Sequence, residues 1–343
     1  MATTFKTLTN NDVTSTRTLL HEAIPITGTI VSGTYSSDGN IKTYSHGMFE
    51  SVYDYPYLSS SANHIFDITE GYSPQSALSA SASIQNSKKI NIYNQMAQVL
   101  AGYTSTGTIQ EFDRDGDLTG GTKIQEALFI NVARLLTKDE IKKGSFELKV
   151  LTGSTPAAPS DLLTIADHGA SSAYKINSPA GEYGILYTSS AAPNSDSGVG
   201  LVYYQAGVVV LTGSIFDGEF GNNGATHDTS SYNIVATDST IANAADGFRN
   251  RLQNIQFNNT TELNSTIYFC RANHNDFNYS SNPTYLSSSK IQVKNNSTDS
   301  PVAYITTVGL YSADNELLAV AKLSEPLKKT PETELTLRVR TDY

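Results

Sequence analysis

The sequence predicts an α+β fold that is β-rich, with multiple short antiparallel strands and hairpins and two or three short helices. Three observations support this prediction: many β-forming residues, many turn-forming residues, and repeated apolar runs separated by turns. The chain holds 20 Tyr and 12 Phe but no Trp, and only 16% of its residues are charged. Tyr, Thr and Val favour strands, whereas Ser, Asn and Gly favour turns. This composition is more typical of β-rich proteins than of compact α/β enzymes.

Length, charge and cysteine content limit the class of protein further. A chain of 343 residues suggests about two domains. The net charge of -10 disfavours nucleic acid as a partner, because a phosphate backbone would be repelled. Cys270 is the single cysteine, which excludes an internal disulfide framework and a Cys-based zinc knuckle. We see neither a secretion signal nor a run of about 18 apolar residues, so we expect no membrane anchor.

The N-terminal part is expected to hold hairpins and one helix. Asp38-Gly39 lies between two runs rich in β-branched residues, which predicts a hairpin because Gly tolerates positive φ. Residues 88–101 carry apolar side chains at i, i+3, i+4 and i+7, which predicts an amphipathic helix, with Gly102 as its C-cap. The expected apolar stripe comprises Tyr93, Met96, Ala97 and Leu100.

The next segment combines strand and helix signals. Residues 128–132 fit both periodicities, and their β-branched content favours a strand. A capping box that begins at Thr137 predicts a short helix ending at Gly144, and residues 146–150 (FELKV) read as a strand.

A linker is predicted near residues 153–161, GSTPAAPSD, where two prolines and small residues occur without an apolar pattern. We expect it to separate an N-terminal β-rich domain, residues 1–152, from a C-terminal β-rich domain, residues 162–343. The sequence leaves a second arrangement open. In this alternative, residues 162–260 are inserted into a core shared by residues 1–150 and 262–343.

The C-terminal part is expected to consist mainly of strands. The runs AYKIN, GEYGILYTS, GLVYYQAGVVVLTGSIF and YNIVAT are interpreted as strands. Residues 240–254 predict a second helix with Thr240 as its cap. Two patterned runs flank Ser312–Asn315 as a hairpin, and TELTLRVRTDY follows as the last strand. Its two faces comprise Leu335, Leu337 and Val339 on one side, and Thr336, Arg338 and Arg340 on the other.

The stretch DRDGDLTGGTKIQE holds the only candidate metal ligands. These are Asp113, Asp115 and Asp117. They fill positions 1, 3 and 5 of a helix-loop-helix calcium loop, but position 6 is Leu118 rather than Gly, and position 12 is Ile124. Glu126 comes two residues too late to replace it. We therefore favour an acidic strand-to-strand turn at Asp115-Gly116 that faces water, and we keep weak cation binding as the alternative.

No catalytic or cofactor-binding motif is visible. The six histidines form no HExxH or HxH motif and no cluster with the cysteine. No serine lies in a GxSxG elbow, and no phosphate-binding loop is present. The sequence therefore nominates no catalytic residue and no cofactor, and we expect a protein that is not an enzyme.

Three segments resemble a known family. They read SSANHIFDITEGYS with KKINIYNQMAQVLAGY, then GGTKIQEALFINVARLLTKDEIKKGSFEL, then CRANHNDFNYSSNPTY with AYITTVGLYSADNELLAVAKLSEPLKK. A weaker fourth piece joins GEYGILY with GLVYYQAGVVVLTGSIF. These segments look like virion structural proteins of tailed bacteriophages, especially contractile-tailed phages of aquatic bacteria. The resemblance covers most of the chain.

The resemblance implies a structural component of the tail, at the baseplate or neck, that is assembled in the bacterial cytoplasm. Its expected partners are copies of itself and other virion proteins, with no nucleic acid and no membrane. The family's motifs are not catalytic, so no site residues are carried over. We expect the last strand or the hairpin before it to add to a neighbour's sheet edge. Deleting Thr336–Tyr343 is then expected to block assembly and leave a folded monomer.

Two other functions stay open at this point. One is a virion-borne receptor-binding or adhesion module, whose surface loop Gly218–Ser231 would contact a host glycan or protein. The other is a tail-associated glycan hydrolase. That enzyme would need a pair of carboxylates, and the sequence nominates no such pair.

Overall fold

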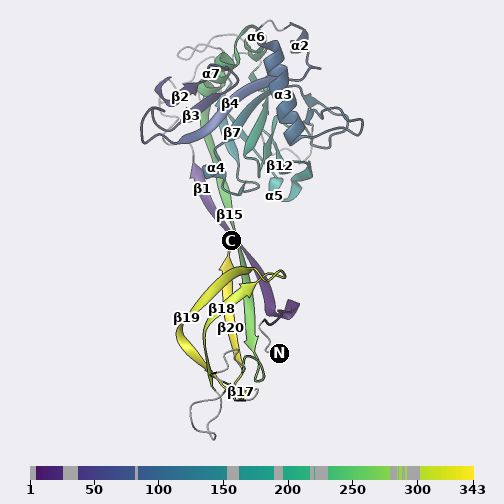
Figure 1. Ribbon diagram of the computed structural model, residues 1–343. Helices are drawn as coiled ribbons and strands as arrows, with labels where there is room; N and C mark the ends of the chain where they lie inside the picture. The colour runs from purple at the N-terminus through teal and green to yellow at the C-terminus, as the bar shows by residue number, and fades with distance from the viewer. Residues whose placement is uncertain are drawn as a thin grey trace. The chain divides into compact units, whose positions relative to one another are not determined.

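The computed structural model confirms the predicted fold class (Figure 1). Strands account for 46% of the chain and helices for 20%, and the sheets are antiparallel. Several strands are longer than expected: β15 (Leu252–Ala272) has 21 residues, and β1 (Val13–Pro25) has 13. The structure describes residues 5–25, 38–81, 84–152, 162–188, 196–216, 220, 231–278, 284, 286–287, 290–291 and 302–343.

The chain forms two compact units. Residues 20–261 form one, called the central unit here, and residues 1–19 and 262–343 form the other, the terminal unit. This division does not coincide with the boundary predicted near residues 153–161, nor with the alternative insertion. The reason is that strands from both sides of that segment pair within one sheet. Residues 153–161 themselves lie outside the described part of the chain.

The central unit is built on an eight-stranded antiparallel sheet, called the large sheet. Two meanders meet in it, and their contact pairs Val209 with Ile130. In spatial order the strands are β11 (Lys175–Ser178), β12 (Gly181–Leu186), β13 (Gly200–Tyr203), β14 (Val208–Thr212), β7 (Glu126–Val132), β4 (His64–Tyr72), β3 (Glu50–Tyr53) and β2 (Ile41–Thr43).

Both faces of the large sheet are buried. Along β7, Leu128 and Ile130 belong to one hydrophobic cluster, whereas Phe129 belongs to the cluster on the opposite face. In β14, Val209 and Val210 are divided in the same way. Successive side chains of a strand point to opposite faces, so continuous apolar runs such as VVVL are required here rather than alternation with polar residues.

Helix α3 (Asn86–Leu100) covers one face of the large sheet (Figure 1). It confirms the helix predicted at residues 88–101. Of the expected stripe, Tyr93, Ala97 and Leu100 are buried, and Met96 packs against the same cluster. Gly102 has a φ of 87° and its amide donates to the carbonyl of Ala97, as a C-cap glycine should.

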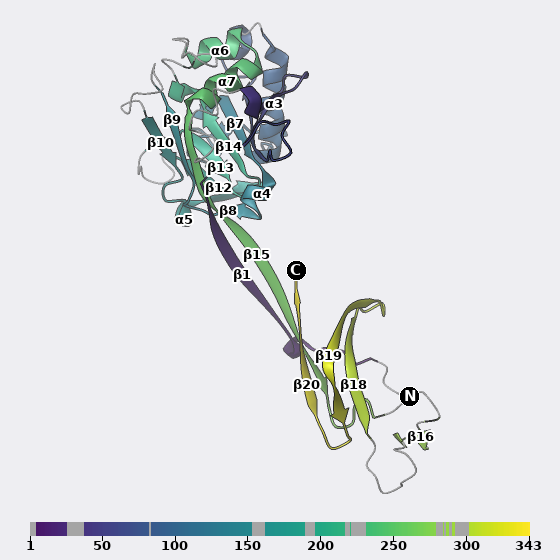
Figure 2. The ribbon, with the colours of Figure 1, turned by 90° about the vertical axis from the view of Figure 1, so that its left-hand side faces the viewer.

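The other face is covered by a smaller sheet and two helices, so that α3 and strands β9 and β10 lie on opposite sides (Figure 2). The small sheet contains β8 (Glu140–Ile141), β9 (Glu147–Leu151), β10 (Leu162–Ala166) and the first part of β15. Helices α6 (Tyr232–Asp238) and α7 (Ile241–Arg251) complete the layer. The hydroxyl of Thr240 accepts the amide of Asn243 at 3.2 Å, which confirms the predicted cap of α7.

Two predicted elements are wrong. The run YNIVAT was expected to be a strand but forms α6, because Tyr232, Val235 and Ala236 recur at i, i+3 and i+4 and are buried together. The helix predicted from Thr137 to Gly144 is also absent. Lys138 has a φ of 56°, and the chain then enters β8, which pairs with β15. Pairing with a strand distant in sequence outweighs the local capping signal.

The described part of the terminal unit consists mainly of strands. The last part of β15 pairs with β20 (Leu335–Asp342), from Ser265 opposite Asp342 to Ala272 opposite Leu335. β18 (Ala303–Tyr311) and β19 (Leu317–Lys329) form the hairpin predicted around Ser312–Asn315. β16 (Leu286–Ser287) and β17 (Lys290–Ile291) form a further short pair.

The remaining elements are single turns. They are α2 (Leu78–Ser81), α4 (Arg134–Thr137), α5 (Ala170–Ala173) and the 3-10 helices Asn10–Asp12, Asp38–Asn40 and Gly213–Phe216. The first strand of the hairpin predicted at Asp38-Gly39 lies outside the described residues, and β2 follows that turn. No helix in the described part of the chain has the length and apolar character needed to cross a membrane.

Candidate functional site

The acidic loop, residues 113–122, connects two short strands of the central unit. β5 (Phe112–Asp113) pairs with β6 (Lys123–Ile124), so that Phe112 lies opposite Ile124. Both of these apolar residues are fully buried in the cluster around α3. The core therefore fixes both ends of the loop, and the flanks are strands, as the predicted turn requires.

The three predicted ligands converge. One carboxylate oxygen from each of Asp113, Asp115 and Asp117 lies within 4.8 Å of the others. The loop backbone orients two of them, because Oδ1 of Asp115 accepts the amide of Asp117 at 3.1 Å and Oδ1 of Asp117 accepts the amide of Thr119 at 2.7 Å. Their Oδ2 atoms are thereby left as candidate ligand atoms. Within the described residues, these aspartates are the one group of three or more His, Cys, Asp or Glu side chains with metal-ligand spacing.

A fourth aspartate, Asp196, reaches the acidic loop from the connection between β12 and β13. Its Oδ1 accepts the amide of Thr122 at 3.0 Å, and its Oδ2 accepts the hydroxyl of Thr122 at 2.9 Å. A Cβ atom placed on Gly121 would lie 3.5 Å from Oδ1 of Asp196 and 3.6 Å from both Oδ1 of Asp113 and Oδ2 of Asp115. Oxygens of three aspartates therefore lie within 3.6 Å of one point beside Gly121.

Asp113 differs from its neighbours by its burial. Its side chain is fully buried, and Oδ2 forms an ion pair with Nζ of Lys123 at 2.7 Å. Oδ1 has no hydrogen-bond partner among the described residues. Burial raises the pKa of Asp113, and Lys123 opposes this effect. The expectation that the acidic side chains face water is therefore wrong for Asp113, because β5 places it at the edge of the core.

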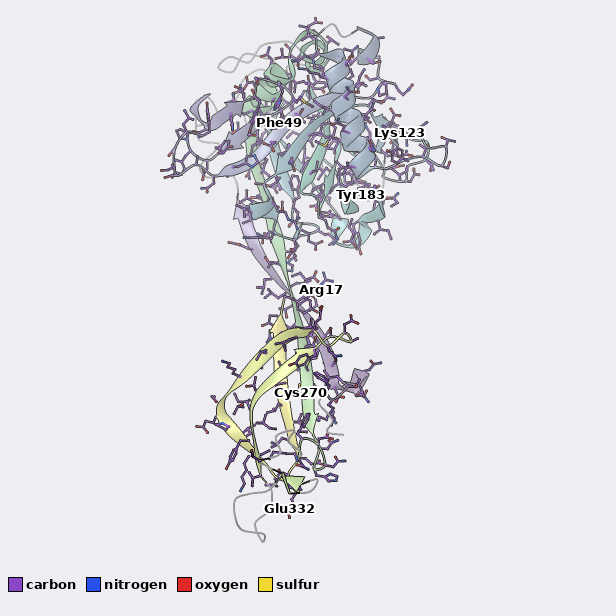
Figure 3. The ribbon with its side chains drawn as sticks, viewed as in Figure 1. Arg17, Phe49, Lys123, Tyr183, Cys270 and Glu332 are labelled. Carbon is purple, nitrogen blue, oxygen red and sulfur yellow. The ribbon has the colours of Figure 1, made fainter. Side chains whose placement is uncertain are left out.

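Two labelled residues in Figure 3, Lys123 and Tyr183, contact the acidic loop. The Tyr183 hydroxyl donates to the carbonyl of Gly116 at 3.1 Å and lies 2.8 Å from Oδ1 of Asn177. Burial raises the pKa of Tyr183, and the negative charge of Asp113 adds to this effect. The loop is thus held by side chains of β6, β11 and β12, rather than standing free of the core.

Few apolar side chains are buried in the described part of the terminal unit. Both large hydrophobic clusters lie within the central unit. Among the described residues of the terminal unit, the buried hydrophobic side chains are Ala272 and Val339. The alternation predicted for the last strand is confirmed: Leu335 and Leu337 point to the same side as Val339, but both are only partly buried. The strands thus have an apolar face without enough apolar atoms to cover it.

Apolar side chains are instead exposed on the terminal hairpin. The hairpin patch comprises Tyr311, Leu318 and Val320, which are exposed by 46%, 69% and 50%. The register pairs Val320 with Gly309, beside which the ring of Tyr311 lies. The ring of Phe5 packs against that of Tyr311 at 4.9 Å. Exposed apolar residues that gather in this way are a sign of an interaction surface.

Two of the histidines lie beside carboxylates that are not part of the acidic loop. His64 lies 2.8 Å from Oδ1 of Asp67, and His274 lies 3.3 Å from Oε1 of Glu334. The loop Gly218–Ser231, proposed for receptor contact, lies almost entirely outside the described residues.

Neither a protein-family model, nor a curated protein, nor a solved structure matches this chain.

Proposed function

We propose that this chain is a non-enzymatic structural component of a phage virion, at the tail baseplate or neck, that acts by homo- and hetero-assembly. The observation that carries the assembly part is the scarcity of buried apolar side chains among the described residues of the terminal unit, called its missing core below. The phage part rests on the resemblance of segments such as GGTKIQEALFINVARLL to virion structural proteins. A separate experiment tests each part.

The missing core has an energetic consequence. Ordering a residue costs about 1–2 kcal/mol of backbone entropy, which burial of apolar surface must offset. Burying one Leu or Val side chain contributes about 1.5–3 kcal/mol. In the terminal unit Leu317, Leu318 and Val320 are at least half exposed. Covering them against another chain would provide the burial that the unit lacks, so we place the assembly surface here.

The strand edges of the terminal unit support the same proposal. Within the described residues, β18 and β19 pair only with each other, as a two-stranded sheet. An isolated hairpin of this kind is marginal in water, and an unpaired strand edge can accept a strand from a neighbouring chain. We take a second copy of this chain as the first occupant, because most soluble oligomers are built from identical chains.

The assembly proposal is tested by sedimentation equilibrium of the full chain and of the double variant Leu318→Asp, Val320→Asp. We expect the wild type to form an oligomer and the double variant to sediment close to the 36.9 kDa of one chain. The matched control is Ile176→Asp, because Ile176 is 73% exposed on β11 of the central unit. This control should associate like the wild type. A double variant that associates as tightly as the wild type would overturn the proposed surface.

The virion proposal is tested by mass spectrometry of purified tailed-phage particles, followed by an electron-microscopy map in which the chain is located. We expect the chain to be present in intact particles at the baseplate or neck. Absence from purified particles of a phage that encodes it would refute the virion proposal and leave the assembly result standing.

A further inference from the structure

We propose that the acidic loop is a calcium site, in which Asp113, Asp115, Asp117 and Asp196 provide carboxylate ligands. This inference is independent of the proposed function, because it concerns the central unit and needs no assembly. Calcium takes six to eight oxygen ligands at about 2.3–2.6 Å in flexible geometry. Ligand atoms on opposite sides of such an ion are therefore about 4.6–5.2 Å apart. The 4.8 Å span of the three loop carboxylates falls in this range.

The buried oxygen of Asp113 is the observation that points to a ligand. Its side chain is fully buried, Lys123 occupies Oδ2, and Oδ1 has no hydrogen-bond partner among the described residues. An unsatisfied buried acceptor costs about 1–3 kcal/mol, and more when it is charged. This Oδ1 faces the point beside Gly121 that oxygens of Asp115 and Asp196 also approach. A bound cation at that point would satisfy it.

The ninth position of the loop explains the role of Asp196. Counted from Asp113, position 9 of a helix-loop-helix calcium loop is Gly121, which has no side chain to offer. Oδ1 of Asp196 lies 3.5 Å from the point where the Cβ atom of a side chain at position 121 would be. The twelfth position, Ile124, is buried in the core and cannot provide a ligand. A second loop would therefore provide the additional ligand. The mismatch with the helix-loop-helix calcium motif at positions 6 and 12 does not exclude a calcium site of this kind.

The charge of the site also favours a divalent cation. Three carboxylates lie within 4.8 Å of one another, and that of Asp196 lies beside them at Gly121. Among the described residues, the Lys123 ammonium is the cation that forms an ion pair with this group, through Asp113. Calcium is preferred to magnesium, because magnesium demands near-ideal octahedral geometry and retains several waters. The Oδ1 atoms of Asp115 and Asp117 already orient the loop backbone, so little reorganisation is required when the ion binds.

The test is isothermal titration of the chelator-treated full chain with calcium chloride. Asp115→Asn and Asp117→Asn are the sharpest variants, because an amide keeps the Oδ1 acceptor and alters only the candidate ligand Oδ2. We expect wild-type binding with a dissociation constant below about 1 mM, weakened about tenfold or more in each variant. Asp314→Asn, a change of the same type in the turn between β18 and β19, should bind like the wild type.

Terbium provides an independent readout. The chain has no Trp, and Tyr183 contacts the loop at Gly116, so excitation of tyrosine should sensitise emission from a bound terbium ion. We expect this emission to fall when calcium is added, and to be weak in Asp117→Asn. Calcium binding with a dissociation constant above about 10 mM, or equal binding by the wild type and both Asn variants, would overturn the proposal.

Discussion

Nζ of Lys89 on α3 lies 3.1 Å from Oε1 of Glu70 on β4, and both side chains are fully buried. The same ammonium donates to the carbonyls of Ala236 and Ser239 at 2.6 and 2.7 Å. One buried cation thus joins the large sheet, α3 and the C-terminal end of α6. Burial raises the pKa of Glu70 to about 7, although Lys89 opposes the effect.

The raised pKa of Glu70 predicts that stability depends on pH. Between the ordinary value of 4.5 and about 7, the folded protein binds a proton at Glu70 that the unfolded chain does not. Glu70 therefore stabilises the folded protein fully below about pH 4.5. As the pH rises from there through 7, the free energy of unfolding falls by at most about 3 kcal/mol.

Urea unfolding of the wild type and Glu70→Gln at about pH 4.5 and about pH 8 measures this effect. We expect the wild type to lose stability relative to the variant at the higher pH. Glu332→Gln, which changes an exposed carboxyl, should track the wild type. A pH-independent difference between the wild type and Glu70→Gln would contradict the assignment.

Replacing Lys89 should destabilise the central unit strongly. Lys89→Met leaves the Glu70 carboxyl and the carbonyls of Ala236 and Ser239 without their shared partner. Breaking a buried pair by removing one partner costs about 3–5 kcal/mol. The matched control is Lys88→Met, because the neighbouring side chain is exposed and donates only to the carbonyl of His46. Chemical unfolding should show a loss of less than about 1 kcal/mol for the control.

Gly71 sets the distance between β4 and α3. A Cβ atom there would lie 2.6 Å from the carbonyl oxygen of Lys89 and 2.8 Å from the amide nitrogen of Tyr93. Backbone atoms of a packed helix cannot yield easily, so we expect Gly71→Ala to cost about 1–3 kcal/mol or more. The comparison variant is Gly107→Ala, whose Cβ atom would have no atom within 4 Å. We expect it to lower the free energy of unfolding only through the backbone strain of a φ of 83°, by about 1–2 kcal/mol. Equal unfolding midpoints for Gly71→Ala and the wild type would contradict the close packing.

The central unit should fold without the terminal unit. Both hydrophobic clusters lie within residues 20–261, so a fragment of these residues should show a cooperative thermal transition by circular dichroism. For the deletion of Thr336–Tyr343, the structure predicts a different result from the folded monomer that the sequence indicated. The deletion removes most of β20 and leaves one edge of β15 without this partner strand from Ser265 to Arg271. We therefore expect this deletion to unfold the terminal unit as well as to block assembly, while the transition of the central unit is retained.

Local signals in the sequence predicted the elements that depend on local chemistry. Helix α3 follows from its apolar stripe and Gly102, and α7 follows from the hydroxyl of Thr240. The terminal hairpin follows from the polar turn between its alternating strands. In each case the residues that decide the structure lie within a few positions of one another.

Elements that depend on distant partners were not predictable in this way. The segment after Thr137 becomes β8 because it pairs with Asn259 and Thr260, more than a hundred residues away. The run YNIVAT fits either period, and only the burial of Tyr232, Val235 and Ala236 in the hydrophobic cluster selects the helix α6. The 21-residue β15 carries no apolar pattern that marks it as one strand.

In the acidic loop, too, the sequence revealed the residues that are close together in the chain but not their distant partner. The sequence placed Asp113, Asp115 and Asp117 together because they alternate along the chain. It missed Asp196, since 74 residues separate it from Thr122 and no spacing rule connects the two. It also placed Asp113 in water, although the alternation that buries Phe112 and Ile124 was visible. A carboxylate beside two core residues was the signal that could have revealed its burial.

Hydrogen exchange of the full chain, measured at increasing protein concentration, tests whether a neighbouring chain completes the terminal unit. Amides of β20, which pair with Ser265 to Ala272, should then become more protected as the concentration rises, while amides of β7 stay protected throughout. Strong protection of β20 in a monomer, unchanged by dilution, would contradict completion by a neighbouring chain.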